Sequence, residues 1–204
     1  LSQRYGVNRE TIREALEILA EEGLVIHRYG VGTFVHSRPL FTAGIEEMDS
    51  VTNMIKKANM TPKTIYLSST VEAATPDDME MFRLERTIEM IELERVRMAD
   101  GTPVVYCVDR LPYEYVKGHS LHEIKSIFNF LENNGKTITH AIAYIEPIGY
   151  DEYVSEILEC GPETALLLLK QLHYDQNDQP LLYSLNYFRS DKFHFHVVRK
   201  RQNA

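Results

Sequence analysis

Residues 1–35 read LSQRYGVNRETIREALEILAEEGLVIHRYGVGTFV and carry the signals of a helix followed by a β-hairpin. Asn8 is a favourable N-cap residue. Apolar residues follow it at the helical i, i+3, i+4, i+7 spacing, at Ile12, Ala15, Leu16 and Leu19. Gly23 is of the residue type that commonly ends a helix. Strand-like stretches at 25–29 and 33–35 flank a Gly-x-Gly turn, so we predict a capped helix and then a hairpin.

A turn, a capped helix and a hairpin in this order are typical of a winged helix-turn-helix, whose recognition helix enters the major groove with its N-terminal residues. Arg9 and Arg13 are i, i+4 neighbours at this end of the helix. One helix face therefore presents two guanidinium groups that can read guanine edges or bind phosphates. A solvated helix with ion pairs of the Arg13–Glu17 kind is the alternative, and the pattern alone leaves both open.

The amino-acid sequence of residues 1–35 resembles the winged helix of the GntR family of bacterial transcription regulators. That family has the pattern Leu-Ala-x-x-Tyr-Gly-Val-Ser-Arg-x-Thr-Val-Arg-x-Ala-Leu, followed by Gly-Leu and a Gly-x-Gly-Thr-Phe-Val wing. The resemblance implies that Arg9, Thr11 and Arg13 contact the major groove. It also implies DNA contacts from the helix cap and from the wing tip near the minor groove, at Asn8, Tyr29, Gly30 and Gly32. Asn8 replaces the family's usual Ser or Thr, which conserves the cap.

The chain begins at Leu1, within what reads as a helical segment. In the GntR family a first helix and a basic arm precede this point. We therefore expect part of the DNA-binding domain to be missing from this chain, which should then bind DNA weakly.

The charges are unevenly distributed along the 204 residues. The whole chain has 22 Lys+Arg against 30 Asp+Glu, a net charge of −8, which taken as one number argues against a nucleic-acid partner. Residues 1–38, however, contain five basic and five acidic residues, so the negative charge belongs entirely to the rest. We predict a DNA-binding domain at 1–38, a linker at 39–44 that contains a proline and a glycine, and a second domain at 45–204.

Several classes of protein are disfavoured by composition. No apolar run approaches the roughly 18–20 residues of a membrane span, and no signal-peptide pattern opens the chain. The cysteines, Cys107 and Cys160, are too few for a disulfide framework, which favours a reducing compartment, the cytoplasm. Surface roles explain the two closely spaced histidine pairs, His119 with His122 and His194 with His196. Nucleotide-binding and nucleophile motifs are absent, so we predict no metal and no cofactor.

The second domain alternates helix-like and strand-like stretches. Helices are expected at 50–58, 76–82, 126–132 and 150–158. Strands are expected at 64–73, 88–98, 103–111, 139–147, 165–174 and 180–189, with an Asp100-Gly101 hairpin signal between the second and the third. These elements predict a mostly antiparallel α+β domain with helices packed on a sheet.

Arg95 and Arg97 are two residues apart on a predicted strand, so both side chains point to the same side of the sheet. Two guanidinium groups on a largely apolar face are costly to leave unpaired. Either carboxylates such as those of Glu94 and Asp109 neutralise them, or an anion does. Ion pairs are the commoner outcome.

Three further motifs resemble the UTRA effector domain of the HutC-type GntR regulators, a fold shared with chorismate lyase. They are Asp-Ser-Val-Thr at 49–52, the Arg-x-Arg-x-x-Asp-Gly-x-Pro hairpin at 95–103, and Tyr-Phe-Arg-Ser-Asp-Lys-Phe at 187–193. In relatives that sense sugar phosphates, the phosphate is held by two helix-start serines and the two strand arginines. The resemblance places these roles on Ser50, Arg95, Arg97 and Ser126. A helix start and two arginines suit an anion.

The rest of the predicted pocket departs from those sensors. Cys107 and Leu182 stand where they have sugar-binding glutamates, and Phe128 stands where a tyrosine is usual. Tyr187 is a candidate pocket aromatic, as are Tyr106 and Tyr183. We therefore predict an anion-binding end with a less polar body, and a small anionic effector other than an amino-sugar phosphate.

Two classes of function follow from these resemblances. The first is a bacterial transcription regulator, a repressor that binds a pseudo-palindromic operator in double-stranded DNA as a homodimer formed by its UTRA domains. The second is a lyase-like enzyme acting on a small aromatic acid, because the effector fold is shared with a lyase. Such enzymes have no winged helix fused in front, so we expect the regulator and not an enzyme. A purely structural domain would have no pocket.

Overall fold

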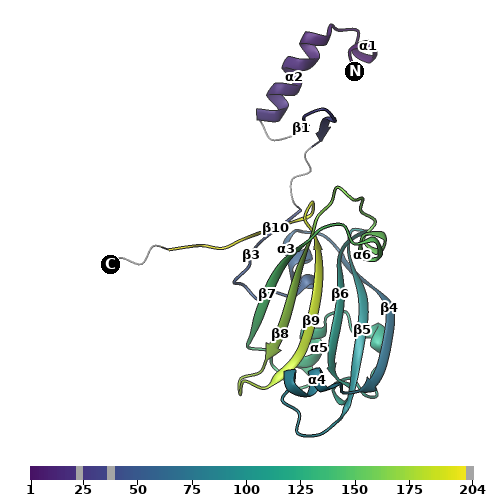
Figure 1. Cartoon of the computed structure of the whole chain (residues 1–204), viewed down its shortest axis with the longest axis vertical. Coiled ribbons are helices and arrows are strands. Elements are labelled where there is room, and N and C mark those ends of the chain that lie inside the picture. The colour runs from purple at the N-terminus through teal and green to yellow at the C-terminus, as the bar shows by residue number, and fades with distance from the viewer. Residues whose placement is uncertain (22–24, 36–39, 201–204) are drawn as a thin grey trace. The chain divides into compact units, whose positions relative to one another are not determined.

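The computed structural model describes residues 1–21, 25–35 and 40–200. The chain divides into two compact units, residues 1–39 and residues 40–204 (Figure 1). Within the described residues, no helix is both long and apolar enough to cross a bilayer.

The first unit contains two helices and a hairpin. Helix α1 (Ser2–Tyr5) ends at Gly6, whose φ of 67° is left-handed, and helix α2 (Arg9–Glu21) follows. The Asn8 side-chain oxygen accepts a hydrogen bond from the Thr11 backbone N–H at 2.7 Å, which confirms the predicted N-cap. Strands β1 (Val25–Arg28) and β2 (Gly32–Val35) pair antiparallel, as the predicted hairpin requires. The predicted helix end at Gly23 lies outside the described residues.

The second unit is built on a six-stranded antiparallel sheet, in the order β4-β5-β6-β9-β8-β7. The strands are β4 (Pro62–Ala73), β5 (Glu89–Ala99), β6 (Thr102–Pro112), β7 (His140–Ile148), β8 (Leu166–Tyr174) and β9 (Pro180–Arg189). Asp100 and Gly101 join β5 to β6 with φ angles of 47° and 82°, the conformation that makes an Asp-Gly pair a hairpin signal. The mostly antiparallel α+β fold is confirmed.

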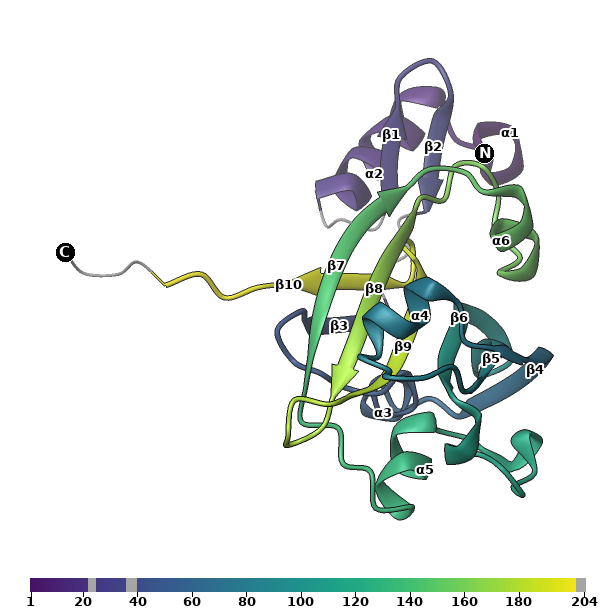
Figure 2. The same cartoon turned by 60° about the horizontal axis from the view of Figure 1, so that its bottom comes forward.

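Helices cover both faces of this sheet. On one face lie α3 (Val51–Lys57) and α5 (Ile127–Asn133), which bury Ile55 and Leu131 in two apolar clusters. On the other face, Phe82 after α4 (Pro76–Met81) packs with Met90, and Val154 of α6 (Glu152–Ile157) packs with Tyr106. Helices α5 and α6 lie toward opposite ends of the sheet (Figures 1 and 2). Two short 3₁₀ helices, η1 (Tyr113–Tyr115) and η2 (Leu121–Glu123), lie between β6 and α5 in the chain.

The structure corrects the predicted linker at 39–44. Residues Phe41–Gly44 form strand β3, which pairs in parallel with β10 (Phe193–His196). The rings of Phe41 and Phe193 stack with centroids 4.5 Å apart, and both side chains are buried. No strand was predicted at 41–44 because these four residues show no alternation. The strand is stabilised by β10, which lies at the far end of the chain. Residue 39 is outside the described residues.

Candidate DNA-binding and effector-binding sites

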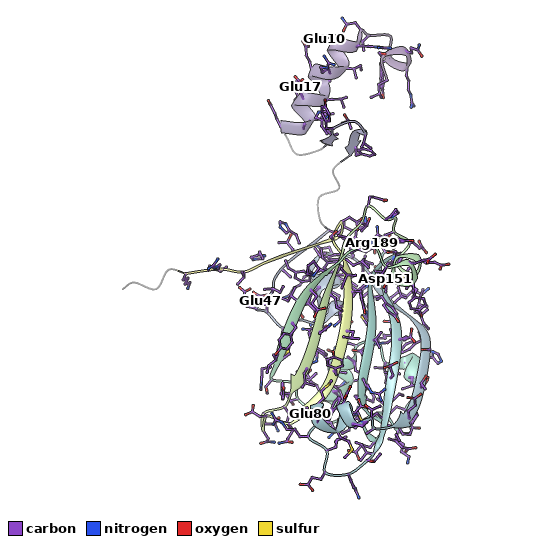
Figure 3. The ribbon with its side chains drawn as sticks, in the orientation of Figure 1. Glu10, Glu17, Glu47, Glu80, Asp151 and Arg189 are labelled. Atoms are coloured by element: carbon purple, nitrogen blue, oxygen red, sulfur yellow. The ribbon has the colours of Figure 1, made fainter. Side chains whose placement is uncertain are left out.

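The N-terminal part of α2 presents the predicted major-groove residues to solvent. Arg9, Thr11 and Arg13 are exposed, and Asn8 caps the helix beneath them. Arg13 lies 3.9 Å from Glu10, with both side chains about 70% exposed. This is an ion pair of the kind that the solvated-helix alternative proposed, with Glu10 in place of Glu17. Figure 3 shows Glu10 near the start of α2 and Glu17 farther along it. An exposed pair at this distance contributes little to stability, so Arg13 can exchange Glu10 for a phosphate or a base.

The hairpin tip carries the predicted wing residues. Tyr29 is fully exposed, and Gly30 and Gly32 have φ angles of 73° and 144°, which side-chain-bearing residues rarely adopt. His27 and Thr33 contact one another across the hairpin at 2.7 Å. The tip is therefore a tight turn that projects one aromatic ring.

A cavity of about 130 Å³ lies in the second unit, on the face of the sheet covered by α3 and α5. Six of the predicted effector residues line it: Ser50, Arg95, Arg97, Cys107, Ser126 and Phe128. The sheet register brings residues that are far apart in the sequence to this cavity. Arg95 pairs with Cys107, and Cys107 pairs with Asn186, across three neighbouring strands.

Both serines are helix N-caps at the cavity. Ser50 accepts a hydrogen bond from the Asn53 N–H at 3.2 Å and starts α3, and Ser126 accepts one from the Asn129 N–H at 3.4 Å and starts α5. Two helices thus begin beside the arginines. Their first N–H groups add a partial positive charge to this end of the cavity.

Arg95 is neutralised within the protein. Its Nε donates to Asp109 Oδ2 at 3.2 Å and its Nη2 donates to the same oxygen, while Ser184 Oγ donates to Asp109 Oδ1 at 2.6 Å. Burial is the largest single effect and opposes the charged form, but the charge and hydrogen bonds of Asp109, together with smaller effects of neighbouring groups, outweigh it and raise the pKa of Arg95. Arg95 and Asp109 therefore form a buried ion pair, in which Arg95 Nη1 is left without an acceptor in the described residues.

Arg97 has only neutral partners. Its Nη1 donates to Thr64 Oγ1 at 2.6 Å and to the Lys125 carbonyl at 2.7 Å, and its Nη2 donates to Thr52 Oγ1. No Asp or Glu in the described ranges forms an ion pair with it, although only 3% of the residue is exposed. Burial lowers the pKa of Arg97. A buried positive charge without a counter-ion thus lines the cavity.

A row of polar side chains was not predicted. Gln171, Ser184 and Asn186 line the cavity, and Asn186 Nδ2 donates to Gln171 Oε1 at 3.1 Å. Ser184 lies between Asp109 and Gln171 in the cross-strand register, so all three share a face. The even-numbered alternation from Leu182 along the last long strand could have identified Ser184 and Asn186. The body of the pocket is more polar than expected.

The structure corrects two predicted effector residues. Leu182 is fully buried in the apolar cluster with Leu93 and Leu111, so it packs beside the cavity without lining it. Tyr187 points to the opposite face, where its ring lies 5.7 Å from that of Tyr106. The reason is the two-residue alternation of β9, which puts odd-numbered side chains on the α6 side. Tyr183 packs on that face as well.

Cys107 is a buried, neutral thiol in the cavity wall. Burial raises its pKa to about 12, and the nearby Arg95 only partly offsets this. Across the described ranges, no group of three or more His, Cys, Asp or Glu residues is placed to hold a metal ion.

Comparisons with known proteins place the chain in a family. Residues 1–35 match the family described as "Bacterial regulatory proteins, gntR family", and residues 57–194 match the "UTRA domain" family. The chain belongs to the GntR family of transcription regulators, in the HutC subfamily that combines a GntR helix-turn-helix with a UTRA domain.

Individual relatives agree with this assignment. The HTH-type transcriptional repressor NagR of Bacillus subtilis is 26% identical over 196 residues, which cover 95% of this chain and 80% of NagR. The crystal structure of PhnF from Mycobacterium smegmatis has a TM-score of 0.73 at 24% identity and covers 98% of this chain and 89% of PhnF. A GntR-family regulator from Enterococcus faecalis has a TM-score of 0.59 at 26% identity and covers 67% and 100%.

These findings settle the class of function. The chain is a GntR/HutC-type transcription regulator with repressors among its homologues, and its helix-turn-helix implies DNA binding. The family consists of regulators and not enzymes, so the lyase alternative does not apply.

Proposed function

We propose that this regulator is a repressor whose operator binding is controlled by a small anion bound in the cavity of the second unit. The observation that carries the proposal is Arg97, a buried guanidinium that lines the cavity and has no carboxylate partner within the described residues. A buried charge without a partner costs several kcal/mol. An anion in the cavity would recover much of that free energy by forming charge-assisted hydrogen bonds.

The helix caps support the same assignment. Ser50 and Ser126 start helices that face Arg97, and each hydroxyl lies in the cavity wall. In the phosphate-sensing relatives that the sequence resembles, the matching serines and arginines hold the anion. Phe128 and Cys107 then form less polar parts of the wall. Because Cys107 replaces a sugar-binding glutamate, we do not expect an amino-sugar phosphate.

DNA recognition is assigned to the first unit. Arg9, Thr11 and Arg13 would contact the major groove from the start of α2, with Asn8 fixing the helix start. The exposed wing tip, formed by Tyr29, Gly30 and Gly32, would approach the minor groove. Chromosomal DNA is reached in the bacterial cytoplasm, where we place the protein.

Control of DNA binding requires two coupled states. We assign dimerisation to the second unit, so that two recognition helices meet the half-sites of a pseudo-palindromic operator. The anion must prefer one spacing of those helices and the operator another, because linkage demands a difference in affinity. Strand β3 follows the DNA-binding unit in the chain, and six residues separate the end of β3 from the start of α3. Helix α3 carries Thr52, whose hydroxyl accepts a hydrogen bond from Arg97. An anion that takes over Arg97 would release that contact.

A thermal-shift screen of carboxylated and phosphorylated metabolites tests the anion site. At least one small anion should raise the Tm of the wild-type chain, because ligands that bind the folded state stabilise it. The same anion should leave the Tm of Arg97→Met unchanged. Arg86→Ala, at an exposed arginine outside the cavity, is the control and should respond like the wild type. A wild-type shift that persists in Arg97→Met would refute the assignment.

A further inference from the structure

We infer that the effector's anionic group is a carboxylate and not a phosphate monoester. The inference rests on the proposed anion site and narrows its ligand class. It follows from the balance of fixed charges around the cavity.

The charged side chains that are buried in the cavity wall sum to one positive charge. Arg95 and Arg97 contribute two, and Asp109 removes one because it is ion-paired to Arg95 at 2% exposure. A carboxylate carries one negative charge and matches this balance. A phosphate monoester carries about −1.5 to −2 near neutral pH, and its second charge would be buried without a partner.

Other acidic groups at the cavity strengthen this selection. Glu46 and Glu47 are exposed on the rim, on the loop between β3 and α3, and Arg95 and Arg97 are the only Lys or Arg residues in the described part of the wall. Lys57 reaches Asp49 at 2.8 Å and so neutralises a third rim carboxylate. The rim therefore offers a dianion additional repulsion and no further cation.

Asp109 cannot easily leave the arginine pair. It sits in the middle of β6, and both of its oxygens are used, one by Arg95 and the other by Ser184 Oγ at 2.6 Å. Asp109 lies two residues beyond Cys107 on the same face of β6, where its carboxylate is bound to Arg95.

The other end of the cavity indicates that the carboxylate is part of a polar molecule. The hydrogen-bonded amides of Asn186 and Gln171 line it two and three strands away from Arg95. Two strand spacings are about 10 Å, the scale of a small metabolite. Hydroxylated acids are therefore suitable probes.

Calorimetry with matched anions tests the inference. The probes are gluconate against glucose 6-phosphate, and glycerate against glycerol 3-phosphate, titrated into the 204-residue chain near neutral pH. We expect the carboxylate that binds to have a Kd at least about tenfold below that of its phosphate partner. Asp109→Asn adds one positive charge to the balance and should improve phosphate affinity relative to carboxylate affinity by at least about tenfold.

A second variant guards against misfolding of Asp109→Asn, which leaves Arg95 buried without a counter-ion. Arg95→Gln combined with Asp109→Asn removes both charges, keeps the balance at one, and should keep the carboxylate preference. A wild-type preference for phosphate, or its appearance in the double variant, overturns the inference while the anion site stands. Absence of binding by all four probes also overturns it, and binding of another anion in the thermal-shift screen would then still support the proposed function.

Discussion

At the scale of single residues, Arg95 and Arg97 have opposite environments although they point to the same face of one strand. Arg95 faces Asp109, which Ser184 holds from the next strand, whereas Arg97 lies among hydroxyl and carbonyl oxygens. The i, i+2 spacing predicted the shared face correctly. It could not predict which arginine would receive the carboxylate, because that depends on the register of β5 against β6.

Stability measurements should separate the two arginines. Arg95→Met leaves Asp109 buried without a counter-ion and should lower the free energy of unfolding by about 3–5 kcal/mol. Arg97→Met removes an unpaired buried charge and replaces it with an apolar side chain, so the free energy of unfolding should fall much less. Urea denaturation of both variants measures the difference. Equal losses would mean that Arg97 is neutralised by a group outside the contacts described here.

Residue identity in the pocket was predictable only in part. The resemblance to UTRA domains led to Ser50, Ser126 and the two arginines, all of which line the cavity. Leu182 was misplaced by two residues along β9, since the wall is made by Ser184 and Asn186. A shift of two residues along a strand keeps the side chain on the same face of the sheet but moves it along the strand. Neither alternation nor composition can therefore detect such a shift.

At the scale of elements, the long strands and capped helices were predictable because each has a local signal. Ser50, Thr75, Ser126 and Asp151 all accept a hydrogen bond from a first-turn N–H of the helix that follows. Strand β3 was missed because its stability comes from β10 at the opposite end of the chain, together with the stacked rings of Phe41 and Phe193. The alternation of His194, Phe195 and His196 does indicate a strand, and β10 contains these residues, whereas residues 41–44 show no alternation.

Helix α4 gives a prediction about acid stability. Burial alone would raise the pKa of Asp78, but hydrogen bonds from Arg110 and Thr75 outweigh it and lower the pKa to about 2 from 3.8. A depressed pKa stabilises the fold above pH 3.8, and this contribution disappears as the pH falls toward 2. Asp78→Asn should therefore cost about 2 kcal/mol near pH 7.

Denaturation at several pH values measures this effect. The gap between wild type and Asp78→Asn should narrow as the pH falls from about 4 to about 2. Asp77→Asn, on the exposed side of the same first turn, is the control and should stay close to the wild type throughout. A gap that does not change with pH would show that the Arg110 ion pair is not its source.

At the scale of the whole molecule, the net charge of −8 is unevenly distributed between the two units. Residues 1–38 sum to zero and carry arginines at the start of α2, while the acidic excess belongs to residues 39–204. Proteins that bind DNA do so through local positive charge, so the total says little about the partner. We expect the acidic charge of residues 39–204 to reduce binding to non-specific DNA.

Operator binding should depend on Arg9 and Arg13 specifically. Loss of one positive charge elsewhere in the protein should not have the same effect. Substituting either by alanine in the full-length regulator should cost about 1–3 kcal/mol if it reads a base, and relax specificity at one position. A residue that binds only phosphate should instead reduce the salt slope by about one. Arg86→Ala removes an equal charge from the second unit and should leave operator binding unchanged. Fluorescence anisotropy against salt concentration distinguishes these outcomes.

The operator Kd of the regulator, measured with and without the anion found by thermal shift, tests the control of DNA binding most directly. An operator fragment selected from DNA by the same protein serves as the probe. We predict that the anion raises the wild-type operator Kd by at least about tenfold and leaves that of Arg97→Met unchanged. An operator Kd that no bound anion alters, or an equal response in Arg97→Met, would contradict it.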